Sequence, residues 1–420
     1  MTYIEFFNNV DCENIISCLT AVPDRVIMFG SSNKLIEARK LKYEKVFCDR
    51  GHNIEFIARS AAKNRLDLII EKLTEIVNTY DDCVFDITGG DELLILALGM
   101  VYSANKDKNI QIHKINIDKN TIYDCDMDGK TVYRETPVLS AEENVRIYGG
   151  EIIYGDVESD HTYRWDLNSD FLADVEYMWR MCRTDVRYWN MQMGVLDAAN
   201  EKGVKSNGGL TLTISMSALE NELKHRKAKY KKAPGIINYL MNKGLITEFD
   251  DESDDSLKVT FKNHQVKRCL VKAGMVLEMK VYTTVKRLTD KKGTPIYNDA
   301  LNGVVIDWDG VCHDERKEHI YDTENEVDVI VMHDAVPVFI SCKNGDFDSD
   351  ELYKLNTVAR RFGGQYGKRV LVATTLEHMN NDKACYIRQR AKDMNITLID
   401  DIHQIDDKEI EARLNGLWSE

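Results

Sequence analysis

The chain has 420 residues, of which 43% are hydrophobic and 30% charged, and its formal net charge is −15. This length is sufficient for two or three domains with separate cores, and no apolar run approaches the roughly 18–20 residues that span a bilayer. The ten cysteines include no C-x-x-C pair, which argues against structural zinc. The N-terminus lacks the basic start of a signal peptide, so we expect a cytoplasmic protein that does not enter a membrane.

Residues 1–140 alternate between strand and helix patterns. The strand patterns lie at 25–30, 45–48, 83–88 and 110–117, the helix patterns at 65–77 and 92–104, and 121–136 has the pattern of a small hairpin. This alternation predicts a parallel sheet covered by helices, a Rossmann-like α/β domain.

Two small polar loops follow strands of this domain. Ligands of open α/β sheets bind at the carboxyl ends of strands, and helix N-termini offer free N–H groups to anions. The sequence contains no G-x-G-x-x-G after a strand and no P-loop, which argues against dinucleotide cofactors and nucleoside triphosphatase activity. The candidate ligand-binding residues are Gly30, Ser31, Ser32, Asn33, Thr88, Gly89, Gly90 and Asp91.

Residues 141–265 read as a helical linker that contains a winged-helix-like segment. A basic helix at 217–232, which includes the run KHRKAKYKK, precedes a helix at 233–244, and two strands then flank the acidic turn at 248–255. Two helices followed by a hairpin outline a winged helix, although a plain linker module fits the same pattern.

Residues 266–420 form a third predicted domain of mixed strands and helices. We expect helices at 266–286, 350–362 and 382–394, and strands at 303–308, 326–332, 336–343, 369–375 and 395–400. The strands at 326–332 and 336–343 read as a hairpin whose second strand ends in a lysine.

An acid, a hydroxyl and a lysine can converge at the end of this hairpin, where the length of the turn places Asp328 opposite a residue between Ile340 and Lys343. Ser341 and Lys343 share one face of their strand, and Asp328 lies near the start of the partner strand. Glu278, on the preceding helix, can reach the same place. Such a cluster suits metal-assisted phosphodiester hydrolysis, because hard divalent cations bind carboxylates and a lysine stabilises the charged phosphate. Spacing alone fits a buried salt bridge between Asp328 and Lys343 equally well.

The order of elements around these residues resembles the PD-(D/E)XK nuclease fold. The resemblance implies that Glu278, Asp328 and Lys343 occupy the motif positions and that Mg²⁺ or Mn²⁺ is held by Glu278, Asp328 and the backbone carbonyl of Cys342. Ser341 stands where that superfamily usually has Glu or Asp, and Glu326 or Asp307 could compensate for the missing acid. Nine basic residues are candidates for contacts with the nucleic-acid backbone: Lys267, Arg268, Lys272, Lys286, Arg287, Arg360, Arg361, Lys368 and Arg369.

The whole chain resembles the CARF-nuclease effectors of type III CRISPR immunity. The segments FGSS (29–32), DITGGDELL (86–94), FISCKNG (339–345) and LNTVARRFGG (355–364) are similar to that family's signatures. The resemblance implies a homodimer that binds cyclic tetra-adenylate and then acts as a metal-dependent endonuclease on single-stranded RNA or DNA, or nicks duplex DNA. The serine at 341 and the basic run at 224–232 also fit a second function. In that alternative the chain is a cyclic-oligoadenylate-responsive, winged-helix transcription regulator with a degenerate nuclease domain.

Overall fold

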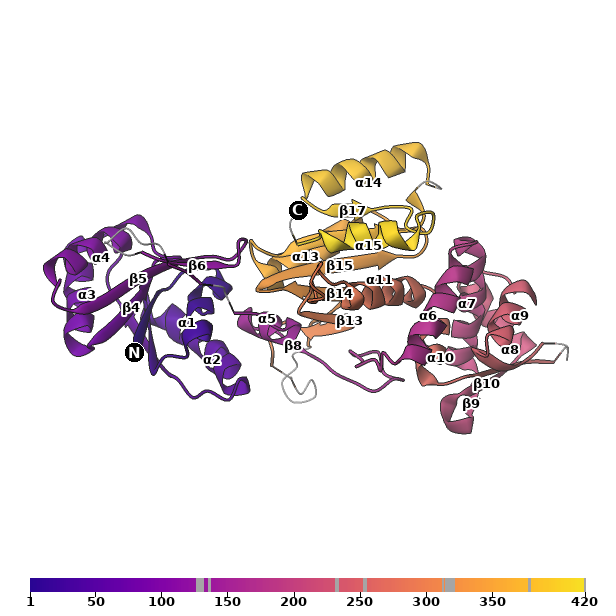
Figure 1. Ribbon diagram of the computed structural model, residues 1–420. Coiled ribbons are helices and arrows are strands. Elements are labelled where there is room, and N and C mark those ends of the chain that lie inside the picture. Colours follow the sequence, from indigo (N-terminus) through magenta and orange to yellow (C-terminus); the bar gives the residue numbers. More distant parts are fainter. Residues whose placement is uncertain are drawn as a thin grey trace.

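The computed structural model describes residues 1–125, 137–230, 234–251, 255–311, 313, 322–376 and 379–418, together with the backbone of 132–134. These residues form three β-sheets in an elongated molecule (Figure 1). The N-terminal sheet lies at one end, the second sheet at the other, and the C-terminal sheet between them. None of the described helices combines the length and hydrophobicity that a membrane span requires.

The N-terminal sheet has seven strands in the order β3-β2-β1-β4-β5-β6-β7, and its first five strands in space are parallel. Helices α3 and α4 pack on one face, and α1 and α2 pack on the other. The Rossmann-like α/β fold expected from the sequence is confirmed. The elements are β1 (Thr2–Phe6), η1 (Asp11–Asn14), α1 (Ile16–Ala21), β2 (Arg25–Gly30), α2 (Asn33–Asp49), β3 (Glu55–Ser60), α3 (Leu66–Thr79), β4 (Asp82–Asp86), α4 (Glu92–Ala104), β5 (Asn109–Asn116), β6 (Thr121–Asp124) and β7 (Val132–Arg134).

Two features of this domain differ from the sequence expectation. Residues 45–48, expected as a strand, form the last turn of α2, where Val46 and Phe47 continue the buried helical stripe of Ile36 and Tyr43. The helical period over this longer segment overrides the short β-rich run. The central strand β1 was not predicted, although all five of its residues are buried.

The second sheet is antiparallel, with the order β11-β12-β10-β9. The succession α7, β10, α8, α9, β11, β12 has the winged-helix order. The predicted basic helix at 217–232 is shorter than expected, because Lys227 adopts a left-handed conformation with φ 57°; residues 231–233 and 252–254 lie outside the described residues. The elements are α6 (Ser169–Cys182), α7 (Val186–Lys202), β9 (Val204–Ser206), η2 (Asn207–Gly209), β10 (Thr211–Ser215), α8 (Met216–His225), α9 (Pro234–Asn242), β11 (Ile246–Asp250) and β12 (Ser256–Phe261).

The C-terminal sheet has six strands in the order β17-β16-β15-β14-β13-β8. Helices α11 and α15 cover one face, and α13 and α14 cover the other. The single helix expected at 266–286 is two helices, which break between Leu270 and Met275. The elements are β8 (Glu151–Ile152), α10 (His264–Leu270), α11 (Met275–Arg287), β13 (Asp299–Asp307), β14 (Glu324–His333), β15 (Val336–Lys343), α13 (Asp350–Gly363), β16 (Lys368–Ala373), α14 (Asn381–Asp393), β17 (Thr397–Ile399) and α15 (Asp407–Asn415).

Helix α5 (Ala141–Ile147) and strand β8 connect the N-terminal domain to the C-terminal sheet (Figure 1). Both lie in the segment expected to be a linker, yet β8 pairs with β13 as the edge strand of the C-terminal sheet. A capping box between Ser140 and Glu143 starts α5. On the other side of α5, the Asn144 side chain donates a hydrogen bond to the Phe362 carbonyl of α13 (2.7 Å).

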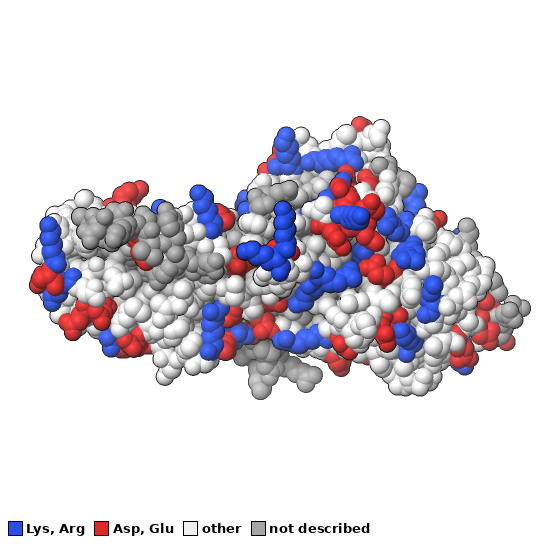
Figure 2. All heavy atoms as spheres, in the orientation of Figure 1, with Lys and Arg blue, Asp and Glu red and all other residues white. Residues whose placement is uncertain are grey.

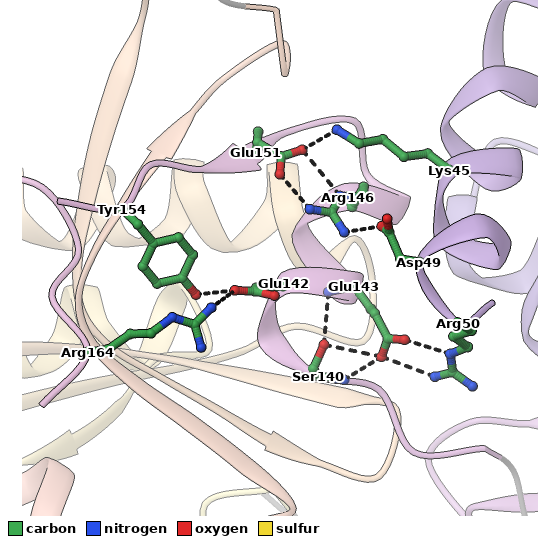
Figure 3. A network of polar contacts seen from close by, with 10 residues as sticks. All are labelled: Lys45, Asp49, Arg50, Ser140, Glu142, Glu143, Arg146, Glu151, Tyr154 and Arg164. Carbon is green, nitrogen blue, oxygen red and sulfur yellow. Dashed lines mark hydrogen bonds and ion pairs between the residues drawn. The ribbon is translucent and has the colours of Figure 1, made fainter. Parts of the chain in front are cut away.

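Three ion pairs tie the end of α2 to α5 and β8 (Figure 3). Lys45 lies 2.7 Å from Glu151, Arg50 lies 2.6 Å from Glu143, and Arg146 contacts Asp49. We refer to these six residues as the α2–α5 junction. Each pair joins the N-terminal domain to the segment that carries the C-terminal sheet, so the two parts are held by side chains as well as by the chain itself.

Candidate active site and ligand-binding loops

The hairpin of β14 and β15 opens into a fork at its end. The ladder between the strands ends at Val329 and Ile340, and the same register places Asp328 opposite Ser341. Asp328 Oδ2 accepts hydrogen bonds from the Cys342 backbone N–H (2.6 Å) and the Ser341 hydroxyl (3.2 Å). The strand ends are therefore bridged by the Asp328 side chain instead of by backbone bonds.

Lys343 lies in this fork and contacts two acids. Its Nζ is 3.9 Å from Asp328 Oδ2 and 2.7 Å from Oε2 of Glu351, on the first turn of α13. Burial opposes the charge on Lys343, but Asp328 and Glu351 outweigh burial and raise the lysine pKa. The ion pair with Asp328 exists, as the spacing suggested, but it is the longer of the two contacts. The sequence did not single out Glu351.

Glu278 reaches the same fork from α11. Its carboxylate is buried, and burial together with repulsion from Asp328 and Glu326 raises its pKa well above the usual range. Burial also raises the pKa of Asp328. Asn302 of β13 joins the two acids, since its amide lies 3.4 Å from Glu278 Oε2 and 3.0 Å from the Asp328 carbonyl. The structure thus brings Glu278, Asp328, Ser341 and Lys343 together.

Asp328, Ser341 and Lys343 border a pocket of about 300 Å³ between the fork and α13, whereas Glu278 is not among the residues that line it. Of the two acids considered as substitutes for the one missing at position 341, Glu326 lines this pocket. Asp307 does not line it; its carboxylate lies near Asp309 and Asp322, which help burial raise its pKa. The pocket-lining residues used below are Glu326, Asp328, Ser341, Lys343, Glu351 and Lys354.

The donor atoms at the fork suit a small divalent cation that retains bound waters. Among the residues that the structure describes, no group of three or more Asp, Glu, His or Cys side chains is placed to hold a metal ion. Glu278 and Asp328 remain a mutually repelling pair of carboxylates, and Mg²⁺ commonly binds through one or two carboxylates plus waters. The Cys342 N–H points at Asp328, so the carbonyl of this strand residue faces the fork as well. The buried Cys342 thiol has a pKa raised well above its usual range, first by desolvation, which disfavours the thiolate as a ligand.

Seven of the nine candidate basic residues have partners within the protein, and three of these, Lys272, Lys286 and Arg287, form ion pairs with Asp160, Asp299 and Glu176. Lys267 pairs with Glu158 at 2.8 Å. Arg268 donates to the carbonyls of a loop at 156–161, Arg361 to those of Tyr148 and Trp308, and Arg369 to the Asn356 side chain and two carbonyls. On the face shown in Figure 2, basic and acidic side chains are interspersed over the C-terminal domain.

The two predicted ligand-binding loops lie at one edge of the N-terminal sheet. Strand β1 runs parallel to both β2 and β4 and lies between them, so the loops at 30–33 and 88–91 flank its carboxyl end. Ser32 caps α2 and Asp91 caps α4 through their side-chain oxygens. The sequence predicted a helix directly after the loop at 88–91, but it predicted none after the loop at 30–33, where α2 begins.

The segment after β1, which the sequence did not single out, separates the two loops. A Cβ atom at Gly89 would lie 2.4 Å from the Phe6 carbonyl oxygen and 2.5 Å from the Asn8 side chain. A Cβ at Gly30 would lie 3.3 Å from Phe7. The glycine at 89 is therefore required by the close approach of two backbones.

A buried pair of acids lies beneath the second loop. Asp86 Oδ1 accepts hydrogen bonds from the Thr88 N–H (2.7 Å) and the Thr88 hydroxyl (2.5 Å). Glu5 accepts from Ser17 and from Cys18. Desolvation raises the pKa of Asp86 to about 6, and desolvation followed by repulsion from Asp86 raises that of Glu5 well above its usual range.

Asp86→Asn should stabilise the protein above neutral pH. The folded-state pKa of Asp86 is raised to about 6, so its stabilising contribution is complete below about pH 4 and is lost as the pH rises through 6. An asparagine keeps an acceptor for Thr88 without the charge. We expect urea unfolding to show a gain of up to about 3 kcal/mol at pH 8 that largely disappears at pH 4. Asp81→Asn, at an exposed position, is the control, and an equal gain at both pH values would contradict the buried charge.

The fold has known counterparts among solved structures. The protein VC1899 from Vibrio cholerae superposes with a TM-score of 0.73 at 15% sequence identity, over 99% of this chain and 97% of that one. Can2 from Sulfobacillus thermosulfidooxidans, solved in complex with cyclic tetra-adenylate, superposes with a TM-score of 0.67 at 16% identity, over 99% of both chains. The chain has the fold of these two proteins. No protein-family model and no curated protein matches the sequence. The structural similarity covers nearly the entire length of this chain and of both counterparts, so it includes the order in which the three sheets follow one another.

Proposed function

We propose that the protein is a cyclic-oligoadenylate-activated, metal-dependent endonuclease that cleaves single-stranded RNA or DNA in the cytoplasm, in type III CRISPR antiviral defence. The observation that carries the proposal is the convergence of three charged groups at the fork: Asp328 and Lys343 line the pocket, and Glu278 lies close enough to Asp328 for their charges to repel. In this proposal residues 1–140 sense the activator and 266–420 cleave, with 141–265 between them. Because β8 pairs with β13, we group the start of the segment 141–265 with the proposed nuclease domain.

The proposed activator is cyclic tetra-adenylate. Can2, which has the same fold, was solved with this molecule bound. The loops at 30–33 and 88–91 offer hydroxyls, backbone N–H groups and two helix N-termini to its phosphates. The ring has two-fold symmetry, so a groove shared by two copies of this chain would match it.

Each residue at the fork has a separate role in the proposed hydrolysis. Glu278, Asp328 and the Cys342 carbonyl would hold Mg²⁺ or Mn²⁺, which when bound neutralises phosphate charge and lowers the pKa of a bound water. Lys343 stays protonated because of its acidic neighbours, so it can stabilise the charge that builds on the phosphate. Ser341 does not supply a third carboxylate. Its hydroxyl instead donates a hydrogen bond that orients Asp328.

The proposed homodimer forms through α4. Three apolar side chains of this helix are exposed, Ile95 by 41%, Leu96 by 52% and Met100 by 49%, and the helix begins at the loop at 88–91. A second copy packed there would cover the apolar surface and complete the groove for a two-fold symmetric ligand.

Leu96→Glu should convert the dimer to a monomer. A carboxylate at the centre of an apolar contact loses its hydration without gaining a partner, which opposes association. Sedimentation analysis should show a halved mass and weaker binding of cyclic tetra-adenylate. Leu41→Glu on α2, where the leucine is 72% exposed, should leave both unchanged. A Leu96→Glu protein that remains dimeric would place the contact elsewhere.

Cleavage of labelled oligonucleotides tests the proposed function directly. We expect cleavage that requires both Mg²⁺ or Mn²⁺ and cyclic tetra-adenylate, and that stops on addition of a chelator. A protein that binds the activator yet cleaves neither RNA nor DNA with any divalent cation contradicts the endonuclease.

The transcription-regulator alternative has less support. The winged-helix order is present, but α9, the second helix of its helix pair, carries no lysine or arginine between Pro234 and Asn242. The adjacent strand β11 adds Glu248 and Asp250. Neither α9 nor β11 therefore offers a basic side chain to the phosphate backbone.

A further inference from the structure

We infer that Glu351 is a positioning residue of the active site, which holds the Lys343 ammonium away from Asp328 and so leaves Asp328 able to bind the cation. The inference rests on the proposed function and deepens it. Glu351 belongs to α13, outside the strand motif that the sequence indicated, and it lines the same pocket as Asp328 and Lys343.

The distances show which acid holds the lysine. Lys343 Nζ lies 2.7 Å from Glu351 Oε2 but 3.9 Å from Asp328 Oδ2, so the hydrogen-bonded ion pair is the one with Glu351. The second oxygen of Glu351 binds Lys354 at 2.7 Å. Both oxygens of Glu351 are thus engaged by cations, which fixes the orientation of its carboxylate.

The local charges keep Glu351 ionised in this role. Burial opposes the charge of Glu351, but Lys343 and Lys354 outweigh it and lower its pKa. The side chain also lies in the first turn of α13, where the helix dipole favours an anion.

Loss of the Glu351 charge leaves Lys343 with Asp328 as its acidic partner. The lysine needs to move by only about an ångström to form a direct ion pair there, since 3.9 Å exceeds the usual length of a charged hydrogen bond by that amount. A lysine bound to Asp328 competes with a divalent cation for the same carboxylate. Glu351 therefore makes the site receptive to metal without binding the metal itself.

The test measures Mn²⁺ binding to the free protein, by calorimetry or electron paramagnetic resonance, in a double-mutant cycle. Glu351→Gln should weaken Mn²⁺ binding by about 10-fold, as loss of a residue that orients a metal ligand typically does. In a Lys343→Ala background the competing cation is gone, so adding Glu351→Gln should change Mn²⁺ binding by less than about 2-fold. Melting curves establish that each variant is folded.

Glu409→Gln is the control, because Glu409 forms an ion pair of similar length with Arg413 (2.8 Å) at a more exposed position of the same domain. It should leave Mn²⁺ binding unchanged. Two results overturn the inference: Glu351→Gln that binds Mn²⁺ as tightly as the unmodified protein, or Glu351→Gln that weakens binding equally with and without Lys343, which would make Glu351 a metal ligand. A wild-type protein that binds no Mn²⁺ and cleaves nothing would instead contradict the proposed function.

Discussion

Lys343→Ala should reduce metal-dependent cleavage by about 100-fold or more while the protein stays folded, because removal of a group that stabilises transition-state charge commonly has an effect of this size. The ammonium lies in the pocket beside Asp328 and is kept charged by two acids. Single-turnover cleavage of a labelled oligonucleotide with saturating cyclic tetra-adenylate measures the effect.

The same variant tests the reading of Lys343 as a purely structural residue. If the lysine only neutralised Asp328, its loss would destabilise the protein by about 3–5 kcal/mol, the usual cost of a stranded buried charge. The structure predicts a smaller cost, since Asp328 keeps its bonds from Cys342 and Ser341. Lys383→Ala, which removes a partner of Asp348 in the same domain, is the control for a lost ion pair. Normal cleavage combined with a strongly lowered melting temperature would assign Lys343 to the fold.

Gly89→Ala should abolish activation by cyclic tetra-adenylate. The added methyl group would lie 2.4 Å from the Phe6 carbonyl oxygen, a backbone atom that cannot move aside alone, so the loop at 88–91 must shift. Overpacking of this kind costs on the order of 1–3 kcal/mol, and the displaced loop no longer presents its N–H groups to the ligand. Calorimetric binding of cyclic tetra-adenylate and activated cleavage should both be lost, while a melting curve shows that the protein is folded.

Gly194→Ala is the matched control for this variant. Gly194 lies within α7, and a Cβ atom there would have no neighbour within 4 Å. Alanine should therefore stabilise this helix by about 0.5–1 kcal/mol and leave the response to the activator intact. Normal ligand affinity in Gly89→Ala would separate this loop from the binding site.

The two strands of the C-terminal hairpin could be predicted closely because their residue pattern is typical of strands and not of helices. Alternation and β-branched residues placed strands at 326–332 and 336–343, and the structure has them at Glu324–His333 and Val336–Lys343. The short turn between them fixed Asp328 near Ser341 and Lys343. A strand pair with a two-residue turn needs no distant information, so its site residues were accessible from the sequence.

Other parts depended on tertiary contacts that leave no local pattern. Strand β8 has only two residues, which is too short to show a period, and it is a strand because β13 lies beside it. Glu351 is one of several charged residues of α13, and although it shares a helix face with Leu355 and Val358, the sequence does not show that this face covers Lys343. Only the packing of α13 over the fork places its carboxylate at Lys343.

Helix α2 gives the loop at 30–33 a rigid connection to the rest of the molecule. It runs without interruption for 17 residues, about 25 Å, from its cap at Ser32 to the α2–α5 junction at Lys45, Asp49 and Arg50. A helix resists compression along its axis far more than a loop does. Any axial push on the loop at 30–33 must therefore arrive at α5, which is bonded to the end of α13, the helix that carries Glu351 over the pocket. The molecule thus has a rigid helix, held at its end by the ion pairs of the α2–α5 junction, between the loop where a ligand would bind and the pocket where a phosphodiester bond would be cleaved.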